Sequence, residues 1–422
     1  MSIDPHLLDD LEWRGLIAHA TDRDALREAL TQGRVRFYVG FDPTAPSLHM
    51  GHLVQILTAR RLQQAGHTPY ALVGGATGMI GDPKESGERV MNTADTVKDW
   101  VERVRRQIEP FLSFDGDNAA TMVNNLDWTQ DLSTIDFLRD IGKHFPVNRM
   151  LARDVVRSRL EAGISYTEFS YVLLQSLDYL NLFRDHGVTL QFGGSDQWGN
   201  LTAGVELIRR SDGGRVHAIA TPLMTKADGT KYGKTEGGAL WLDPKLMPPY
   251  SFFQFWLNAE DAKVGELLRV FTFLPREEIE ALEAAHAEKP FLRAAQKALA
   301  EQVTSLVHGE QETQRIIAAS AALFGGGDLS GLGPALGAAL QEAGVITLPR
   351  SAQLPGVVDL LVEAGLAKSK GEARRTVAEG GAYLNNVRVE DVDAVPSAAD
   401  LVDGEWLVLR RGKKKFAGVR VQ

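Results

Sequence analysis

One stretch near the N-terminus, residues 36–78, constrains the fold most. Residues 36–41 (R-F-Y-V-G-F) have the composition of a short strand, and D-P-T-A-P breaks it. An amphipathic helix is predicted for about residues 49–64, and residues 68–73 read as a second strand that ends in a glycine-rich turn, G-G-A-T-G. A strand, a helix and a strand within about 40 residues are typical of a βαβ unit with parallel strands. The chain is therefore expected to contain an α/β domain.

The rest of the chain divides by pattern. Similar strands are predicted at 188–192 and 216–220, and the mostly helical pattern of 93–185 indicates an insertion between two halves of a sheet. Helical patterning continues from 250 to about 324, and Gly325-Gly326-Gly327 marks a linker. Beyond it, two short helices (357–365 and 370–379) and a strand–turn–strand at 382–389, with Asn385-Asn386 as the turn, indicate a small α+β unit. The predicted domains are 1–247 (catalytic), 248–325 (helical), 326–351 (linker) and 352–422 (C-terminal).

Composition excludes several kinds of site. The chain has no cysteine, so it has no disulfide, no thiolate zinc site and no cysteine nucleophile. Its ten histidines show no H-E-x-x-H spacing, and no metal site is expected. No apolar run approaches the roughly 18 residues that a membrane span needs, and the acidic start at 1–10 is unlike a secretory signal. A cytoplasmic protein with no membrane partner is expected.

Charge is unevenly distributed. The net charge is −9, yet residues 352–422 carry 11 basic and 10 acidic residues, and the basic ones cluster. Clustered Lys and Arg are typical of a surface that binds a polyanion. The candidate residues for this surface are Lys368, Lys370, Arg374, Arg375, Arg410, Arg411, Lys413, Lys414 and Lys415.

Two short motifs point to phosphate chemistry. His49-Met50-Gly51-His52 stands at the predicted start of a helix, where unpaired N–H groups and the helix dipole favour a phosphate. Lys231-Tyr232-Gly233-Lys234-Thr235 lies in a polar stretch that could close over a polyphosphate. A histidine-capped helix and a solvated basic loop are the structural alternatives.

Two further patterns indicate a substrate pocket. Tyr171, Gln175 and Asp178 share one face of a helix predicted over 165–182, which could equally be a polar stripe facing solvent. Gly193-Gly194-Ser195-Asp196-Gln197 follows a strand, an arrangement common at ribose-binding sites and in plain tight turns.

Together these strings resemble the bacterial tyrosyl type of the class I aminoacyl-tRNA synthetases. His49–His52 is similar to the family's H-I-G-H signature, and 231–235 to its K-M-S-K-S signature in the form K-F-G-K-T. The strings Y-V-G-F-D-P-T, V-G-G-A-T-G-M-I-G-D-P, Y-V-L-L-Q-S-L-D and G-G-S-D-Q-W-G-N match in order, and the tail resembles the RNA-binding fold of the fourth small-subunit ribosomal protein. The resemblance covers nearly the whole chain.

The resemblance implies a Rossmann-like catalytic domain, a helical domain and an RNA-binding tail. It implies activation of L-tyrosine by ATP, with magnesium, to tyrosyl-adenylate and transfer of the tyrosyl group to tRNA(Tyr). It also implies a homodimer with an interface near Tyr166.

Site roles follow from the same resemblance. Tyr38 and Asp178 would hold the tyrosine hydroxyl, and Asp82, Tyr171 and Gln175 its α-ammonium. Gln197 would lie near the carboxylate, with Asn125 and Trp128 supporting the pocket. The expected ATP contacts are Gly40, Asp42, His52, Gly194, Asp196 and the backbone of Leu223 and Met224. The expected β- and γ-phosphate contacts are Thr44, His49, Lys231, Lys234 and Thr235. Arg89 aligns with a family arginine, whereas the loop after Asp82 is one residue shorter and leaves the role of Lys84 open.

Three alternatives stay open at this stage. A tryptophanyl synthetase would need an acid near the indole but not Tyr38. A small nucleotidyltransferase also uses H-x-G-H but is shorter and lacks the RNA-binding tail. An RNA-binding protein that keeps the synthetase fold without the activity would not need both signature motifs, residues 49–52 and 231–235, to be intact.

Overall fold

The structure is a computed structural model that describes residues 3–84, 87, 91–230, 232, 239–325, 327–350, 353–412 and 415–422. The chain forms two compact units, Met1–Asp243 with Ala262–Ala281 and Pro244–Asp261 with Leu282–Gln422. None of the helices in these described ranges is long and apolar enough to cross a membrane.

The first unit is built on a six-stranded sheet in the order β1-β6-β5-β2-β3-β4. Neighbouring strands from β6 to β4 run parallel, and β1 pairs antiparallel with β6. The predicted α/β class is therefore confirmed. The bounds are β1 His19–Ala20, β2 Arg36–Phe41, β3 Thr68–Val73, β4 Thr121–Asn124, β5 Leu190–Gly194 and β6 His217–Thr221.

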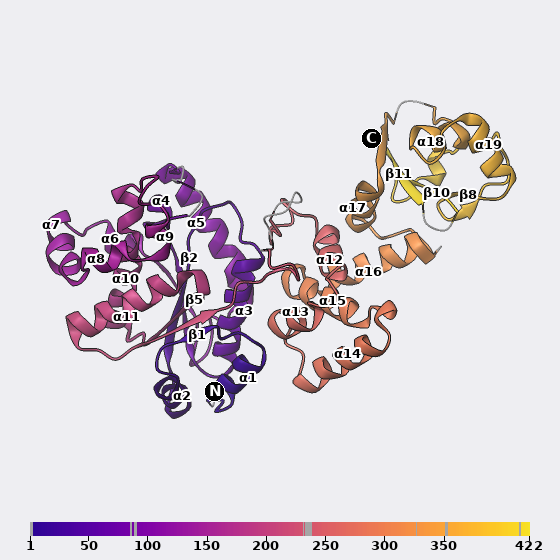
Figure 1. Ribbon diagram of the computed structural model, residues 1–422. Helices are drawn as coiled ribbons and strands as arrows, with labels where there is room; N and C mark the ends of the chain where they lie inside the picture. Colours follow the sequence, from indigo (N-terminus) through magenta and orange to yellow (C-terminus); the bar gives the residue numbers. More distant parts are fainter. Residues whose placement is uncertain are drawn as a thin grey trace. The chain divides into compact units, whose positions relative to one another are not determined.

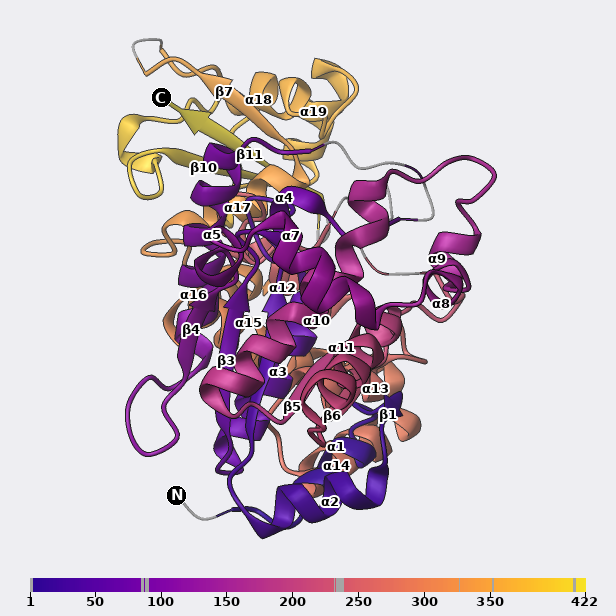
Figure 2. The same cartoon turned by 90° about the vertical axis from the view of Figure 1, so that its left-hand side faces the viewer.

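Helices cover both faces of this sheet. Helices α10 (Tyr166–His186) and α11 (Trp198–Asp212) lie on one face, and α3 (Met50–Gln64) and α5 (Ala94–Ile108) on the other (Figure 1). Figure 2 looks onto the face that carries α10 and α11. Ser165 caps α10 by accepting the backbone N–H of Glu168, and Gly187 ends the helix with φ 61°.

Helix α3 lies where it was predicted but is not amphipathic. Ten of its residues are buried, because it lies between the sheet and α13 (Val264–Phe271). Even the charged residue Arg61 is buried, at 5% exposed, and it donates to the carbonyl of Thr272 at the end of α13. The segment 262–281 therefore folds as part of the first unit.

The insertion between the sheet halves is mostly helical, as predicted, except that it also holds the edge strand β4. The remaining helices of this unit are α1 Leu7–Trp13, α2 Arg23–Gln32, α4 Thr77–Ile80, α6 Leu126–Thr129, α7 Thr134–Asp136, α8 Val147–Leu151 and α9 Asp154–Arg157.

The second unit begins with helices that pack on one another. These are α12 Pro249–Leu257, α15 Ala294–His308, α16 Glu310–Gly325 and α17 Pro334–Ala343, and residues of α14 Arg276–Glu288 belong to both units. Trp256 and Phe252 of α12 are fully buried in this helical part.

A five-stranded sheet follows, in the order β7-β11-β10-β8-β9. Its strands are β7 Val345–Leu348, β8 Ala382–Leu384, β9 Val387–Arg388, β10 Trp406–Arg411 and β11 Lys415–Val421, packed against α18 Val357–Glu363 and α19 Lys370–Ala378. Asn385 and Asn386 form the predicted turn, with φ 49° and 65°. Helix α17 and strand β7 fall inside the stretch expected to be a linker, 326–351.

Candidate active site

The strand order has its topological switch point between β2 and β5. From these two central strands the chain continues outward in opposite directions, to β3 and β4 on one side and to β6 on the other. Ligands of open parallel sheets bind outside the carboxyl ends of the strands at such a switch point. Asp42 follows β2 there, and β5 ends at Gly194, beside which Leu223 lies with its Cδ2 3.7 Å from where a glycine Cβ would stand. Asp196 is exposed just after β5, in the turn of 195–197.

The two histidines of the first motif face each other at the start of α3. Their ring centres are 4.0 Å apart. His49 Nδ1 accepts the backbone N–H of Gly51 at 3.1 Å, and His52 Nδ1 accepts that of His49 at 3.2 Å. Burial lowers the pKa of His49, and burial together with His49 lowers the pKa of His52 well below its usual value. Both rings are therefore neutral at pH 7, with the proton on Nε2.

The chain that follows the second motif returns to this helix start. The backbone N–H of Met50 donates to Leu240 at 3.0 Å, and that of Leu242 donates to Leu48 at 2.9 Å. Lys231, Lys234 and Thr235 themselves lie outside the described residues, as does Arg89. Thr44 is exposed next to the end of β2.

A buried polar cluster is formed by side chains of β2 and α10 and their neighbours. Tyr38 is 1% exposed and Asp178 3% exposed. Asp178 accepts hydrogen bonds from Asn125 Nδ2 at 3.0 Å and from Trp128 Nε1 at 2.9 Å. The Tyr38 hydroxyl donates to the backbone carbonyl of Gln175 at 3.4 Å. Asp178 faces the interior, so the alternative of a solvent-facing stripe is wrong.

Burial governs the electrostatics of this cluster. It raises the pKa of Asp178 to about 7, with a further rise from Asp42, although the bonds from Asn125 and Trp128 pull the pKa down. Burial and then the Asp178 charge raise the pKa of Tyr38 well above its usual value, so its hydroxyl stays protonated. The cluster therefore offers one neutral donor and one carboxyl that titrates near neutrality.

A second set of bonds joins groups expected in different subsites. The Tyr171 hydroxyl donates to Asp42 Oδ2 at 2.7 Å, and Thr77 Oγ1 donates to Asp42 Oδ1 at 2.6 Å. Asn125 Nδ2 donates to Thr77 Oγ1 at 2.9 Å. A Cβ on Gly74 would come within 2.1 Å of Asp42 Oδ1, which explains a glycine there.

A third set surrounds Asp82. Gln197 Nε2 donates to Asp82 Oδ2 at 2.8 Å, and Asn200 Nδ2 donates to Asp82 Oδ1 at 3.1 Å. Gln175 is half-buried on the same face of α10 as Tyr171 and Asp178. Met224 is buried and Gly40 is exposed.

The candidate RNA-binding residues gather on α19 and the β10–β11 hairpin. Lys368, Lys370, Arg374, Arg375 and Lys415 are exposed. Acids that are distant in sequence neutralise part of the set, since Lys370 pairs with Asp359 at 2.7 Å and Arg411 with Glu372 at 2.8 Å. Arg410 stacks on Tyr383 at 4.1 Å. Lys413 and Lys414 lie outside the described residues.

Three residues of the site were not assigned from the sequence. Thr77 and Asn200 stand inside quoted strings, G-G-A-T-G and G-G-S-D-Q-W-G-N, so a signal was present but gave no role. Arg153, which donates to Asn200 Oδ1, lies in the helical insertion and carries no sequence signal.

Two family descriptions match the chain. "tRNA synthetases class I (W and Y)" matches residues 30–325, and "Tyrosine--tRNA ligase SYY-like C-terminal domain" matches residues 340–419. The fold and the site therefore define a class I aminoacyl-tRNA synthetase, a class that uses ATP.

Individual proteins narrow the assignment. The chain is 62% identical to "Tyrosine--tRNA ligase" of Streptomyces coelicolor, covering 98% of this chain and 99% of that one, and 62% identical to that of Streptomyces griseus, covering 98% of each. The solved C-terminally truncated mitochondrial tyrosyl-tRNA synthetase of Aspergillus nidulans is similar at TM-score 0.69 and 30% identity, covering 75% of this chain and 94% of that one. The chain belongs to the tyrosine–tRNA ligase family, and its activity is the joining of tyrosine to tRNA. A tryptophanyl-tRNA synthetase from Plasmodium falciparum, at 14% identity and TM-score 0.53, shares the fold alone.

Proposed function

We propose that the chain forms tyrosyl-adenylate at the carboxyl ends of β2 and β5 and then transfers the tyrosyl group to the 3′ end of tRNA(Tyr). One observation carries the proposal: the neutral pair His49 and His52 at the start of α3 follows β2 in the chain, and β2 carries Tyr38 of the buried tyrosine–aspartate pair. The first suits a polyphosphate and the second a phenol.

The tyrosine substrate would be read at both ends. Tyr38 and Asp178 bind the phenol, because one donates and the other accepts. Asp82, Tyr171 and Gln175 bind the α-ammonium, and Gln197 lies near the carboxylate. Asn125 and Trp128 hold Asp178, and their hydrogen bonds to its two oxygens support that role.

ATP would lie across the switch point. Gly40, Asp42, His52, Gly194 and Asp196 contact the nucleotide, with the backbone of Leu223 and Met224 facing adenine. Thr44, His49, Lys231, Lys234 and Thr235 meet the β- and γ-phosphates, and Arg89 is a further catalytic residue. Because both histidine rings are held neutral, they serve as Nε2–H donors rather than as cations, and the positive charge comes from the lysines and arginine.

The chemistry follows from positioning. A carboxylate oxygen of tyrosine attacks the α-phosphorus of ATP, the bond between the α-phosphorus and its bridging oxygen breaks, and pyrophosphate leaves. A terminal ribose hydroxyl of tRNA then attacks the tyrosyl carbonyl and AMP leaves. Magnesium enters as part of the MgATP substrate. No protein side chain becomes covalently linked, so the protein contributes orientation and charge stabilisation.

The C-terminal α+β part, 352–422, would bind tRNA through its basic residues. Residues 1–247, together with 262–281 of the first unit, would form the catalytic domain and the rest of 248–325 the helical domain, with translation in the cytoplasm as the setting. Exposed Lys and Arg on α19 and the β10–β11 hairpin support the RNA-binding role.

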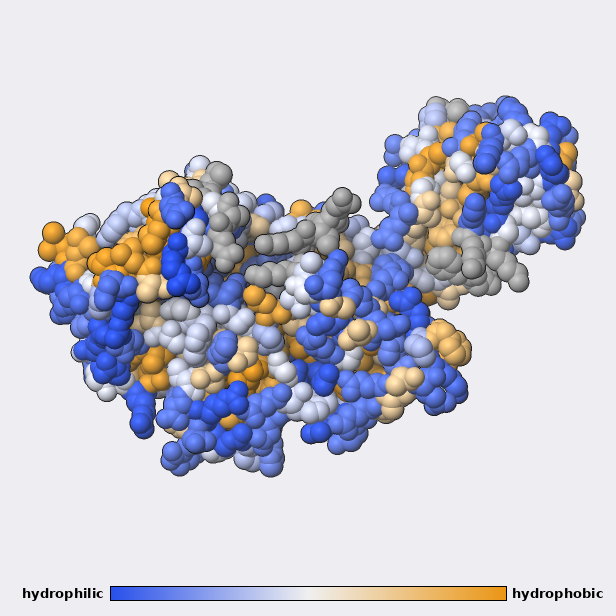
Figure 3. Space-filling view, viewed as in Figure 1, coloured by the Kyte–Doolittle hydropathy of each residue, from blue (hydrophilic) through white to orange (hydrophobic). Residues whose placement is uncertain are grey.

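A homodimer is proposed through the helical insertion. Exposed apolar side chains gather there, on and beside α7, α8 and α10, and Figure 3 shows apolar surface at this end of the first unit. They are Ile135, Leu138, Val147, Leu151 and Tyr166. Sedimentation of Val147→Glu should show a shift toward monomer, and an unchanged mass would contradict this interface.

The direct test is ATP–pyrophosphate exchange with each of the twenty amino acids. Exchange that depends on tyrosine and on no other amino acid is expected. Exchange that tryptophan drives equally well would contradict the assignment of Tyr38 and Asp178 to a phenol.

A further inference from the structure

A directed chain of hydrogen bonds runs from Arg153 to Asp82. Arg153 Nη2 donates to Asn200 Oδ1, and Asn200 Nδ2 donates to Asp82 Oδ1 at 3.1 Å. Asn200 Nδ2 also donates to Gln197 Oε1 at 2.9 Å, and Gln197 Nε2 donates to Asp82 Oδ2 at 2.8 Å. Each oxygen of the Asp82 carboxylate thus accepts a hydrogen bond from an amide side chain. One of these amides, Asn200, also accepts a hydrogen bond from Arg153.

The arginine fixes the direction of this chain. An amide side chain can be turned either way round, whereas a guanidinium only donates and a carboxylate only accepts. Asn200 must therefore turn its oxygen to Arg153 and its NH₂ group to Asp82. That choice leaves Gln197 to accept from Asn200 and to donate to Asp82. Without Arg153, Asn200 could turn its oxygen toward the carboxylate, which would repel it.

The surroundings are shaped for this contact. Asn200 is 1% exposed on α11. A Cβ on Gly199 would come within 3.3 Å of Arg153 Nε, so the glycine leaves room for the guanidinium. Burial lowers the pKa of Arg153 while the Asp82 charge raises it, which places the two charges within electrostatic reach. Arg153 and Gly199 both line a cavity of about 440 Å³.

We propose that Asn200 and Arg153 are positioning residues for the amino-acid substrate, which hold the Asp82 carboxylate in the orientation that receives the α-ammonium group. The inference rests on the proposed role of Asp82. It has a distinctive consequence, because a ligand that lacks the α-ammonium should not respond to either residue. A general loss of packing would weaken the binding of both kinds of ligand to the same extent.

The test is calorimetric binding of two ligands, L-tyrosine and 3-(4-hydroxyphenyl)propionate, which keeps the phenol and the carboxylate but has no amine. Asn200→Ala should weaken the binding of tyrosine about tenfold and change the binding of the second ligand less than twofold. The variant loses the hydrogen bond from Asn200 to the charged Asp82, which in turn contacts only the ligand that has the ammonium group. Asn118→Ala is the matched control, a buried asparagine whose amide bonds the carbonyls of Gln63 and His67, and it should change neither.

Further variants separate position from packing. Arg153→Met should reproduce the selective loss, whereas Arg153→Lys, which keeps a donor, should restore part of it. In an Asp82→Asn background, Asn200→Ala should add no further selective loss.

The failures are distinguishable. Equal weakening of both ligands by Asn200→Ala would show a packing role and overturn the inference. A selective effect of Asp82→Asn with none from Asn200→Ala would overturn it while leaving the proposed function intact. If Asp82→Asn itself is not selective, the proposed role of Asp82 falls and the inference falls with it.

Discussion

Asn125 donates a 3.0 Å hydrogen bond to Asp178 while the same amide nitrogen donates to Thr77 Oγ1 at 2.9 Å. Thr77 in turn bonds Asp42 at 2.6 Å. One fully buried amide therefore ties the carboxyl proposed to read the phenol to the carboxyl proposed to contact ATP. The two proposed subsites are therefore joined by hydrogen bonds, and these buried polar groups satisfy one another.

The first prediction concerns pH. Burial raises the pKa of Asp178 to about 7, and the phenol requires an ionised acceptor there. Protons therefore compete with tyrosine below that value, so tyrosine affinity should fall as pH drops from 8 to 6 and level off above about 8. Calorimetric Kd values across this range measure the step. Asp178→Asn should remove it, and a step of the same midpoint in that variant would assign the titration elsewhere.

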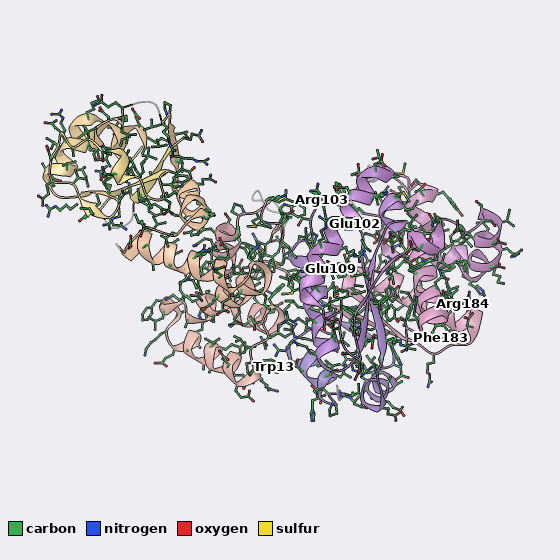
Figure 4. All side chains as sticks on the ribbon, turned by 180° about the vertical axis from the view of Figure 1, so that it is seen from behind. Trp13, Glu102, Arg103, Glu109, Phe183 and Arg184 are labelled. Carbon is green, nitrogen blue, oxygen red and sulfur yellow. The ribbon has the colours of Figure 1, made fainter. Side chains whose placement is uncertain are left out.

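The second prediction concerns Trp128. Its indole N–H bond to Asp178 holds the pKa of that carboxyl down, so Trp128→Phe should move the midpoint of the tyrosine-binding step to higher pH. Trp13→Phe is the matched control, because Trp13 lies on α1 against Arg14 and Arg276 (Figure 4). An unshifted midpoint in Trp128→Phe would show that the indole does not act on Asp178.

The third prediction concerns the phosphate loop. Lys231→Ala or Lys234→Ala should slow tyrosyl-adenylate formation while tyrosine binding changes little, because a cationic contact made mainly in the transition state is lost. Such a donor lowers the activation free energy by roughly 2.7–4 kcal/mol, and its removal raises the barrier by that amount. Pre-steady-state rates and tyrosine Kd values should be measured together. A rate within a few-fold of the parent, with a strongly raised Kd, would contradict the role.

The fourth prediction concerns tRNA. Arg374 and Arg375 are exposed on α19, and replacing both by Ala should raise the KM for tRNA and lower the salt dependence of binding by about two units of slope, but leave ATP–pyrophosphate exchange unchanged. Arg103→Ala on α5, an exposed arginine paired with Asp99, is the control (Figure 4). Unchanged tRNA charging by the double variant would remove α19 from the RNA surface.

Local pattern was enough to predict the elements nearest the site. Strands β2 and β3 coincide with their predicted ranges, because their apolar runs are bounded by a proline-rich break and a glycine turn. The Asn385-Asn386 turn was also predicted, since both positions need the left-handed backbone that asparagine tolerates.

Other elements depend on contacts that no local pattern encodes. Strand β4 is a four-residue, partly exposed edge strand that exists through its pairing with β3. Strands β10 and β11 were not predicted: each has a short continuous buried run, residues 406–409 and 417–419, next to the basic residues at their turn, and neither shows the alternating burial that indicates a strand. Arg153 and Asn200 meet only because the insertion folds back onto α11.

The most direct measurement of the central claim is kcat/KM for tyrosine against phenylalanine in the parent, Tyr38→Phe and Asp178→Asn. Phenylalanine fits wherever tyrosine fits, so it can be rejected only through polar groups that its missing hydroxyl leaves unpaired. The account predicts a modest loss of discrimination for Tyr38→Phe, which removes a neutral donor, and a larger loss, about tenfold or more, for Asp178→Asn, which removes a charged acceptor of the same shape. An unchanged ratio in both variants would mean that the phenol is read elsewhere, and the placement of the tyrosine pocket beneath α10 would be wrong.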